Sequence, residues 1–579
     1  MHLSHFLLFT PLVSAIWPLP RTLTTGTSTL WISRNVAVKY GSAGASISSS
    51  FPASPNISSQ AGPPTGADIV HTALLRANNA LFKTNFVPWM LHPRGSVFEP
   101  GADDGSGPQV TELCLQLPGD TAAALSTPPP PDADESYNLT LTVDGTVTIA
   151  AQTALGLSHG LSSLTQLFYS HSSSGGVYTP LAPVTIVDGP VFPHRGLNLD
   201  LSRSYFPKED LYRVLDALSL VKMNRFHLHI TDSQSWPLVI PSLPDLAAKG
   251  ATRPDWVYTP EDLAAVQDYG ARRGVMVYLE TDMPGHTASI YQAYPELVAA
   301  YDVRPNWDTY AAEPPSGTLK LNSSKVEAFL DTLFADLLPR VKPWTSIYHT
   351  GGDEVNEKAY GLDDSVKSSD KSVLQPLMQK FVDGLHKRVR GAGLTPVVWE
   401  EMLLVWNLTL GPDVIVQAWQ GETAVAAITA AGHKALVGSS TVWYLDCGHG
   451  QWLSFTPQTS AQFYPYADYC SPRHNWKVIY AHDPLAHIPA DQHHLVQGGE
   501  VHLWAEQTDR QNLDTMLWPR AAAAAEVLWA GAKDELGQNR SQVEAAPRLA
   551  EVRERLVAGG VRAEPVQMVW CLRERGCVL

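Results

Sequence analysis

The sequence has few charged residues and no cluster of positive ones. Charged residues make up 17% of the 579, and 41 Lys and Arg stand against 57 Asp and Glu, a formal net charge of −16. A nucleic acid or an anionic membrane surface would need a block of Lys and Arg, and the chain contains none. Neither partner is expected, and a neutral substrate is favoured.

Cysteine is also scarce, with five residues and no Cys-x-x-Cys or His-Glu-x-x-His pattern. We therefore predict no zinc site and no other metal. In an exported chain the spacing favours two short local bridges, one between Cys447 and Cys470 and one between Cys571 and Cys577. Cys114 is then left over as a thiol buried within a strand.

Long apolar runs are missing beyond the N-terminus, where none approaches the ~18 residues of a membrane span. The short run at 6–13 and the small residues that end it predict a signal peptide over 1–15, although no Lys or Arg precedes the run. The chain is thus expected to be secreted. Five glycosylation triplets agree with export, at Asn56, Asn138, Asn322, Asn407 and Asn539.

The first third of the chain predicts a small α+β domain over 16–189. A stretch near 41–66 is rich in Ser, Gly and Pro and is typical of a flexible or pro-segment. Helices are predicted over 68–83 and 154–168 and a strand over 110–117. Alternating apolar residues on both sides of Asp144-Gly145 predict a hairpin.

From residue 190 to 579 the pattern changes to strands alternating with helices. The strands are predicted at 195–199, 225–230, 275–279, 345–349, 396–399, 414–418, 435–437 and 498–503. Eight such units indicate a (β/α)8 TIM barrel with a C-terminal extension, so the fold class is α/β with a smaller α+β domain in front.

Catalytic residues of such barrels lie where the strands end. Acids and aromatic residues recur at these positions: Asn198, Asp200, Arg203, Asp232, Glu280, Asp282, His286, Asp353, Glu354, Trp399, Glu400, Glu401, Trp419, Tyr444, Asp446, Trp504 and Glu506. A rim of acids and flat rings, without clustered Lys or Arg, suits an uncharged polyol with apolar ring faces. That description fits a sugar.

Five motifs occupy these positions in a fixed order. They are 192–197 (FPHRGL), 228–236 (LHITDSQSW), 282–286 (DMPGH), 349–356 (HTGGDEVN) and 498–506 (GGEVHLWAE). Together they resemble glycoside hydrolase family 20, the β-N-acetylhexosaminidases, and most of all its secreted fungal branch. The resemblance also implies a zincin-like fold for the N-terminal domain.

The adjacency of Asp353 and Glu354 bears on mechanism. Neighbouring side chains leave the backbone in different directions and are poorly placed to flank one scissile bond as two carboxylates usually do. The resemblance implies instead that the substrate's own 2-acetamido group is the nucleophile. Glu354 would protonate the leaving oxygen and later activate water, and Asp353 would orient the acetamido group.

Other roles follow from the resemblance alone. Asp232 and His286 would form a relay to Glu354, whereas His227, His229 and His349 are better explained as core residues. Arg195 would grip ring hydroxyls, with a structural ion pair as its alternative. The remaining expected contacts are the walls Trp399, Trp419 and Trp504, the polar groups Tyr444, Asp446 and Glu506, and Trp476 stacking on the leaving group.

We therefore predict an exo-β-N-acetylhexosaminidase that removes terminal N-acetylglucosamine or N-acetylgalactosamine with retention, for breakdown of chitin or glycans, and without a cofactor. Two alternatives remain: a carbohydrate-binding barrel without catalysis, and a related glycosidase that releases a disaccharide. A homodimer is suggested by the resemblance only.

Overall fold

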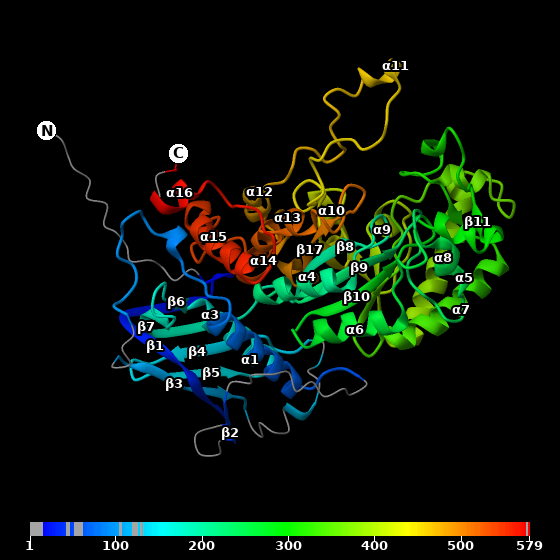
Figure 1. Ribbon diagram of the computed structural model, residues 1–579. Helices are drawn as coiled ribbons and strands as arrows, with labels where there is room; N and C mark the ends of the chain where they lie inside the picture. The colour runs from blue at the N-terminus through cyan, green and yellow to red at the C-terminus, as the bar shows by residue number, and fades with distance from the viewer. Residues whose placement is uncertain are drawn as a thin grey trace.

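The computed structural model describes residues 16–41, 47–50, 62–102, 107–118, 125–127, 130, 132–574 and 577–578. The predicted signal peptide, Asn56 and much of the Ser/Gly-rich stretch lie outside the described residues. The chain folds into an N-terminal sheet domain and a larger barrel (Figure 1). None of the helices in these ranges is long and apolar enough to cross a membrane.

The N-terminal domain is built on one sheet with the strand order β2-β1-β3-β5-β4-β7-β6. Its strands are β1 (Thr22–Tyr40), β2 (Ile47–Ser50), β3 (Gln109–Gln116), β4 (Tyr137–Leu141), β5 (Thr146–Ala151), β6 (Tyr169–Ser170) and β7 (Val177–Asp188). Helices α1 (Gly66–Phe82) and α3 (Ala154–Gln166) share their apolar core with these strands. The predicted hairpin is β4–β5, where Gly145 takes a φ of 89°.

The barrel closes in the order β10-β13-β14-β15-β16-β17-β8-β9, and the fold class predicted from sequence is confirmed. Its strands are β8 (His194–Asp200), β9 (Arg225–Thr231), β10 (Met276–Thr281), β13 (Ile347–His349), β14 (Thr395–Trp399), β15 (Ile415–Gln417), β16 (Lys434–Val437) and β17 (Val496–Leu503). Each coincides with a predicted strand to within two residues at either end.

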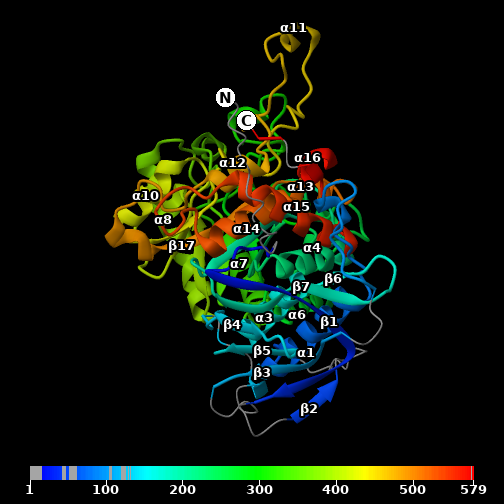
Figure 2. The same ribbon diagram turned by 90° about the vertical axis from the view of Figure 1, so that its left-hand side faces the viewer.

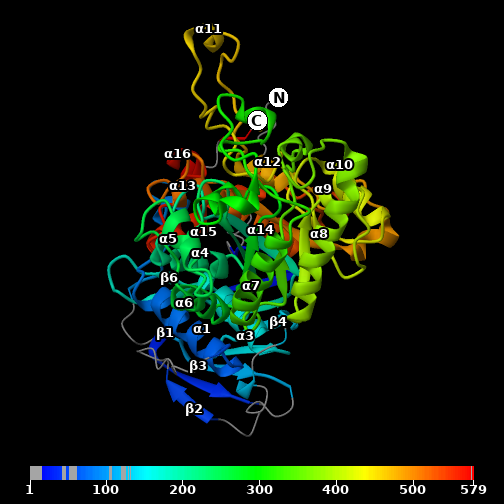
Figure 3. The same cartoon turned by 90° about the vertical axis from the view of Figure 1, so that its right-hand side faces the viewer.

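Amphipathic helices surround the barrel (Figures 1 and 3). They are α4 (Lys208–Leu220), α5 (Asp245–Gly250), α6 (Pro260–Ala271), α7 (Ser324–Val341), α8 (Lys371–Gly391), α9 (Glu401–Leu404), α10 (Glu422–Ala430), α12 (Trp476–Ala481), α13 (Leu513–Leu517), α14 (Arg520–Ala530), α15 (Gln542–Ala558) and α16 (Val569–Glu574). In α4 the apolar residues Leu211, Val214, Leu215 and Leu218 recur at helical spacing and are buried.

Two long insertions extend from the strand ends. The first joins β10 to β13 and contains β11 (Val298–Ala299) and β12 (Thr318–Leu319). The second joins β16 to β17. Within it, residues 448–469, which we call the arm, carry α11 (Pro457–Ser460) away from the body of the molecule in all three views (Figures 1 to 3).

The N-terminal domain packs against the other end of the barrel, where β8 and β9 begin. Arg195 at the start of β8 pairs with Glu135, and Lys222 before β9 lies 2.9 Å from Asp188. Trp529 of α14 joins the apolar core of the N-terminal domain. Since these contacts close one end of the barrel, the rim of strand ends is left to form a site.

Candidate active site

A cavity of about 380 Å³ opens at the C-terminal rim of the barrel. Its lining combines acids, histidines and aromatic rings from the strand ends, the first insertion and the arm: Arg203, His286, Trp307, Glu313, Asp353, Glu354, Trp419, Tyr444, Asp446, Trp452, Tyr469, Trp504 and Glu506 among them. Eight of these thirteen residues were predicted as site residues from the sequence.

The turn after β13 brings its acids into this cavity. Gly351 and Gly352 take φ values of 71° and 106°, which other residues adopt only under strain. A Cβ at Gly351 would lie 1.8 Å from Oδ1 of Asp282. The missing side chains let the turn lie directly against the loop after β10, and the N–H of Gly352 donates to the same oxygen at 2.7 Å.

The two adjacent acids have different surroundings. The Asp353 side chain is 10% exposed and lies close to the buried carboxyl group of Asp282. Burial and the charge of Asp282 raise the pKa of Asp353 well above its ordinary value, and burial raises that of Asp282 to about 7. Glu354 is 32% exposed and takes a φ of 49°. Glu354 is therefore the more accessible proton donor of the two.

His286 connects Glu354 with Asp232. Its Nε2 lies 3.4 Å from Oε2 of Glu354, and its Nδ1 lies 3.0 Å from Oδ1 of Asp232. Burial alone would lower the pKa of His286, but the charges of Asp232 and Asp353 raise it well above the ordinary value. The raised pKa favours the imidazolium form of the ring, which can stabilise negative charge on Glu354. Like Glu354, His286 has a positive φ, of 53°.

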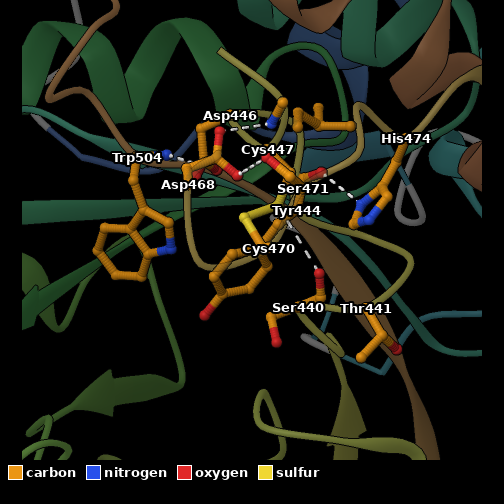
Figure 4. Close-up of a disulfide and its surroundings, with 12 residues drawn as sticks. Ser440, Thr441, Tyr444, Asp446, Cys447, Asp468, Cys470, Ser471, His474 and Trp504 are labelled. Carbon is orange, nitrogen blue, oxygen red and sulfur yellow. Dashed lines mark hydrogen bonds between the residues drawn. A yellow bond between two sulfur atoms is a disulfide. The ribbon is translucent and has the colours of Figure 1, made fainter. Parts of the chain in front are cut away.

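Aromatic residues and buried acids form the wall beside Asp353. Trp419 stacks on Tyr444 with ring centroids 6.2 Å apart, and its Nε1 donates to Glu401 at 2.9 Å. Burial and the charge of Asp353 raise the pKa of Glu401 to about 9. Figure 4 shows the rings of Tyr444 and Trp504 beside the disulfide that closes the arm.

Trp399 lies beneath this wall. The side chain is fully buried and its ring centroid lies 6.3 Å from that of Trp504. Its Nε1 donates to Glu280 at 2.6 Å. Among the predicted walls, Trp419 and Trp504 line the cavity, and Trp399 supports Trp504 from below.

Arg203 brings a guanidinium group to the cavity. Its guanidinium lies 3.3 Å from Asp200, 3.0 Å from Asp232 and 3.0 Å from Glu313. Burial and the charge of Glu313 raise the pKa of the nearby Glu506 well above its ordinary value. Arg203 was recorded among the rim residues in the sequence, but no role was predicted for it.

The prediction that Arg195 grips a substrate is wrong. Arg195 lies at the N-terminal start of β8, is fully buried, and pairs with Glu135 of the N-terminal domain. Its guanidinium also donates to the backbone oxygens of Lys222 and Phe192. The alternative, a structural ion pair, is correct.

The prediction for Trp476 is also wrong. Trp476 begins α12, is 7% exposed, and packs edge-to-face on Tyr480 within the barrel's outer core. Besides Tyr444, the insertions bring the aromatic rings of Trp307, Trp452 and Tyr469 to the cavity. The sequence around Trp307, Trp452 and Tyr469 contains no pattern that distinguishes these cavity residues from Trp476.

The disulfides join Cys447 to Cys470 and Cys571 to Cys577, as predicted. The first closes the base of the arm beside Tyr444, and Asp468 accepts hydrogen bonds from the N–H groups of Gly448 and Gly450 there (Figure 4). Cys114 forms no disulfide within the described ranges and lies in β3 as predicted, but it is half-buried rather than buried.

Buried carboxylates and imidazoles approach one another closely enough for metal coordination near Asp353 and Glu280. The imidazoles and carboxylates near Glu280 pair with one another, however, through short ion pairs. We assign none of them as a metal ligand.

Comparisons with known proteins agree with the site. The model of glycosyl hydrolase family 20, catalytic domain, matches 192–532, and that described as beta-acetyl hexosaminidase like matches 16–167. A β-hexosaminidase of Arthroderma benhamiae is 43% identical and covers 98% of both chains. A chitooligosaccharidolytic β-N-acetylglucosaminidase of Ostrinia furnacalis is 32% identical over 82% of this chain and 80% of its own. The fold of a Vibrio harveyi exo-β-N-acetylglucosaminidase matches with a TM-score of 0.72 at 18% identity, over 96% of this chain and 79% of that one.

Proposed function

The chain belongs to glycosyl hydrolase family 20 and is an exo-β-N-acetylhexosaminidase, and we propose that it works by substrate assistance through Asp353 and Glu354. The proposal is supported by the different surroundings of the two adjacent acids. One is buried against Asp282, and the other is a third exposed and touches an imidazolium.

In this mechanism Glu354 donates a proton to the leaving oxygen and later takes one from water. The acetamido oxygen of the substrate attacks the anomeric carbon, and Asp353 holds the acetamido N–H while positive charge develops. The phenol of Tyr444 would hydrogen-bond the attacking oxygen. Trp419 and Trp504 would enclose the acetamido methyl group and the ring face, with Asp446 bonded to the N–H of Trp504 at 3.3 Å.

Recognition of the ring hydroxyls is assigned to Arg203, with Glu506 and Glu313 beside it. Arg203 replaces Arg195 in this role because it lines the cavity and carries a guanidinium among three carboxylates. Its interactions would position the sugar away from the reacting carbon.

Cleavage of p-nitrophenyl N-acetyl-β-glucosaminide by the pure protein at mildly acidic pH tests this assignment. We expect release of the free monosaccharide and no comparable cleavage of p-nitrophenyl β-glucoside, which lacks the acetamido group. Equal rates on both would contradict substrate assistance. Binding without cleavage would support the alternative of a carbohydrate-binding barrel without catalysis. Release of a disaccharide would support the alternative of a disaccharide-releasing glycosidase.

We propose chitin oligosaccharides as the natural substrates. The relative from Ostrinia furnacalis is a chitooligosaccharidolytic β-N-acetylglucosaminidase, and the aromatic lining of the cavity suits a neutral glycan. Chitobiose and chitotriose should therefore be cleaved from the non-reducing end. Slow cleavage of both beside fast cleavage of glycoprotein glycans would favour the other substrate class.

Export is part of the proposal. Four sequon asparagines, Asn138, Asn322, Asn407 and Asn539, are exposed, and both disulfides suit an oxidising compartment. Protein recovered from culture medium should begin near residue 16 and lose mass on treatment with an N-glycanase. Full-length protein retained in the cells would contradict secretion.

We further propose that the chain pairs with a second copy through the arm. Tyr464 is 78% exposed and Phe463 46%, and residues 448–467 contain no Asp, Glu, Lys or Arg in a chain of charge −16. Two uncharged aromatic arms can meet without repulsion. Sedimentation should give a dimer that becomes a monomer on replacing Phe463 and Tyr464 with Ser; a wild-type monomer at micromolar concentration would refute pairing.

A further inference from the structure

The barrel interior holds a row of alternating carboxylates and imidazoles, which we call the ion chain. It runs from the catalytic rim towards the opposite end and consists of Asp232, His229, Glu280, His227, Glu500 and His194. Each is at most 5% exposed. Branched aliphatic side chains ordinarily fill such a barrel, and buried ion pairs are poor stabilisers because desolvation cancels their attraction. A role in catalysis is therefore favoured over one in stability.

The upper part of the ion chain leads directly to the proposed acid. Oδ2 of Asp232 lies 2.7 Å from Nε2 of His229, and Nδ1 of His229 lies 2.7 Å from Oε2 of Glu280. The other oxygen of Asp232 contacts His286, which contacts Glu354. Four successive polar contacts thus connect Glu280 with Glu354.

Glu280 has ring nitrogens close to both of its carboxylate oxygens. His227 and His229 of β9 contact one oxygen, and His349 of β13 and Trp399 of β14 contact the other. Burial would raise the pKa of Glu280, but the neighbouring imidazoles hold it well below its ordinary value. Burial would lower the pKa of His229, but Glu280 and Asp232 raise it to about 10. The two groups form a buried ion pair.

Asp232 receives positive charge from both sides. His229 and Arg203 face Oδ2, at 2.7 and 3.0 Å, and His286 faces Oδ1 at 3.0 Å. The backbone N–H of Ser233 also donates to Oδ1. Since Arg203 is shared with Asp200 and Glu313, His229 is the one partner of Oδ2 whose charge depends on the ion chain.

We propose that His229 and Glu280 are positioning residues for the acid: they fix Asp232, and through it the orientation and charge of His286 beside Glu354. The inference rests on the proposed role of Glu354. It makes two buried residues part of the proton-handling apparatus: His229, which borders the cavity, and Glu280 behind it.

The variants His229→Gln and Glu280→Gln remove one charge each and preserve shape. With p-nitrophenyl N-acetyl-β-glucosaminide we expect kcat to fall about 10- to 100-fold and KM to stay within about 2-fold, because the acid is misplaced while the sugar contacts are intact. In His229→Gln the site loses a positive charge and holds its protons more tightly, so the alkaline limb of kcat/KM should move to higher pH.

The double variant separates a linked pair from two independent core residues. Loss of Glu280 removes the anion that keeps His229 charged, so the double variant should be about as slow as either single one. Multiplied losses that follow the fall in melting temperature would overturn the proposal. So would variants with wild-type kcat and pH profile. A wild-type chain that leaves the glycoside uncleaved would refute the proposed function instead.

His386→Gln is the matched control. His386 of α8 is a buried imidazole whose pKa is lowered to about 3 by burial, and its Nε2 has no hydrogen-bond partner among the described residues. Its replacement should leave kcat and the pH profile unchanged. Glu280→Asp keeps the charge and should recover much of the rate lost in Glu280→Gln.

Nitrogen-15 spectra of the histidines in the wild-type protein test the proposal without any substitution that could disturb folding. They should contain at least two imidazolium signals, from His229 and His286, that stay constant between pH 6 and 8. Spectra in which every buried imidazole is neutral at pH 6 would overturn the proposal.

Discussion

The carboxyl groups of Asp353 and Asp282 lie close enough for Asp282 to affect the ionisation of Asp353. The pKa of Asp353 lies well above its ordinary value because the side chain is buried and because Asp282 is beside it. In the empty enzyme Asp353 therefore ionises only as the pH rises through that raised pKa. Since an ionised Asp353 is the form that stabilises the developing cation, this pKa contributes to the acid limb of kcat/KM.

Replacement of Asp282 by Asn should move that acid limb to lower pH, because the variant loses the negative charge that opposes ionisation of Asp353. The measurement is kcat/KM against pH on the aryl glycoside. Asp331→Asn, at a carboxylate of α7 with 72% exposure, is the control and should leave the limb in place. A limb displaced to higher pH would contradict the assignment.

Arg203 provides a second residue-level prediction. Arg203→Gln should raise KM for the aryl glycoside by about 10- to 100-fold, because a charge-assisted contact to a ring hydroxyl is worth about 1.5–3 kcal/mol. Asp232 would also lose a cation, so kcat should fall as well. Unchanged KM would show that the ring hydroxyls are recognised elsewhere.

The confusion of Arg195 with Arg203 shows what sequence could have decided. Arg195 lies in the first motif, and Arg203 lies six residues after the motif ends. The strand predicted at 195–199 already placed Arg195 at the N-terminal end of the strand, away from the rim. The rim position of Arg203 was visible, whereas its carboxylate partners come from three segments, the most distant of them 110 residues along the chain. Only the fold brings those together.

At the scale of elements, the glycine turn after β13 determines where the acids lie. Gly351→Ala should reduce kcat/KM by at least about 100-fold, since its Cβ would overlap Asp282 and displace Asp353. Gly361→Ala, where nothing lies within 4 Å of the added Cβ and φ is not positive, is the matched control. An active Gly351→Ala enzyme with unchanged KM would contradict the described turn.

Element prediction succeeded where local patterns were strong. All eight barrel strands and helices α1 and α3 were located from the sequence pattern. β1 and β7 were not predicted. β1 alternates poorly because much of it is exposed at both faces, and it joins the sheet through partners about 80 and 150 residues away. The arm likewise could not be placed, because its course depends on a disulfide and not on a core of its own.

At the scale of the whole molecule, the two domains are joined by buried ion pairs. Burial would raise the pKa of Glu135, but Arg195 and His159 hold it well below its ordinary value. The folded state therefore keeps Glu135 ionised where the unfolded chain would bind a proton, at about pH 4.3. Its contribution to stability is complete above that pH and is lost as the pH falls further.

Glu135→Gln should lower the stability of the protein by about 3–5 kcal/mol, because Arg195 would remain buried without an anion. The apparent melting temperature, measured between pH 3.5 and 6, should drop and lose part of its acid dependence. Activity at 25 °C should persist, since the junction lies at the end of the barrel opposite the cavity. A raised KM with an unchanged melting temperature would indicate that Arg195 takes part in substrate binding.

In the proposed mechanism the substrate's acetamido oxygen is the nucleophile, and fluorination of the acetyl group tests that role. Each fluorine added to the acetyl methyl weakens that oxygen while changing size little. For p-nitrophenyl glycosides bearing zero to three fluorines, we predict that kcat/KM falls steeply at each step, and that the dependence flattens in Asp353→Asn. Rates independent of fluorine in the wild-type enzyme would mean that a carboxylate of the protein attacks instead, and would contradict the account.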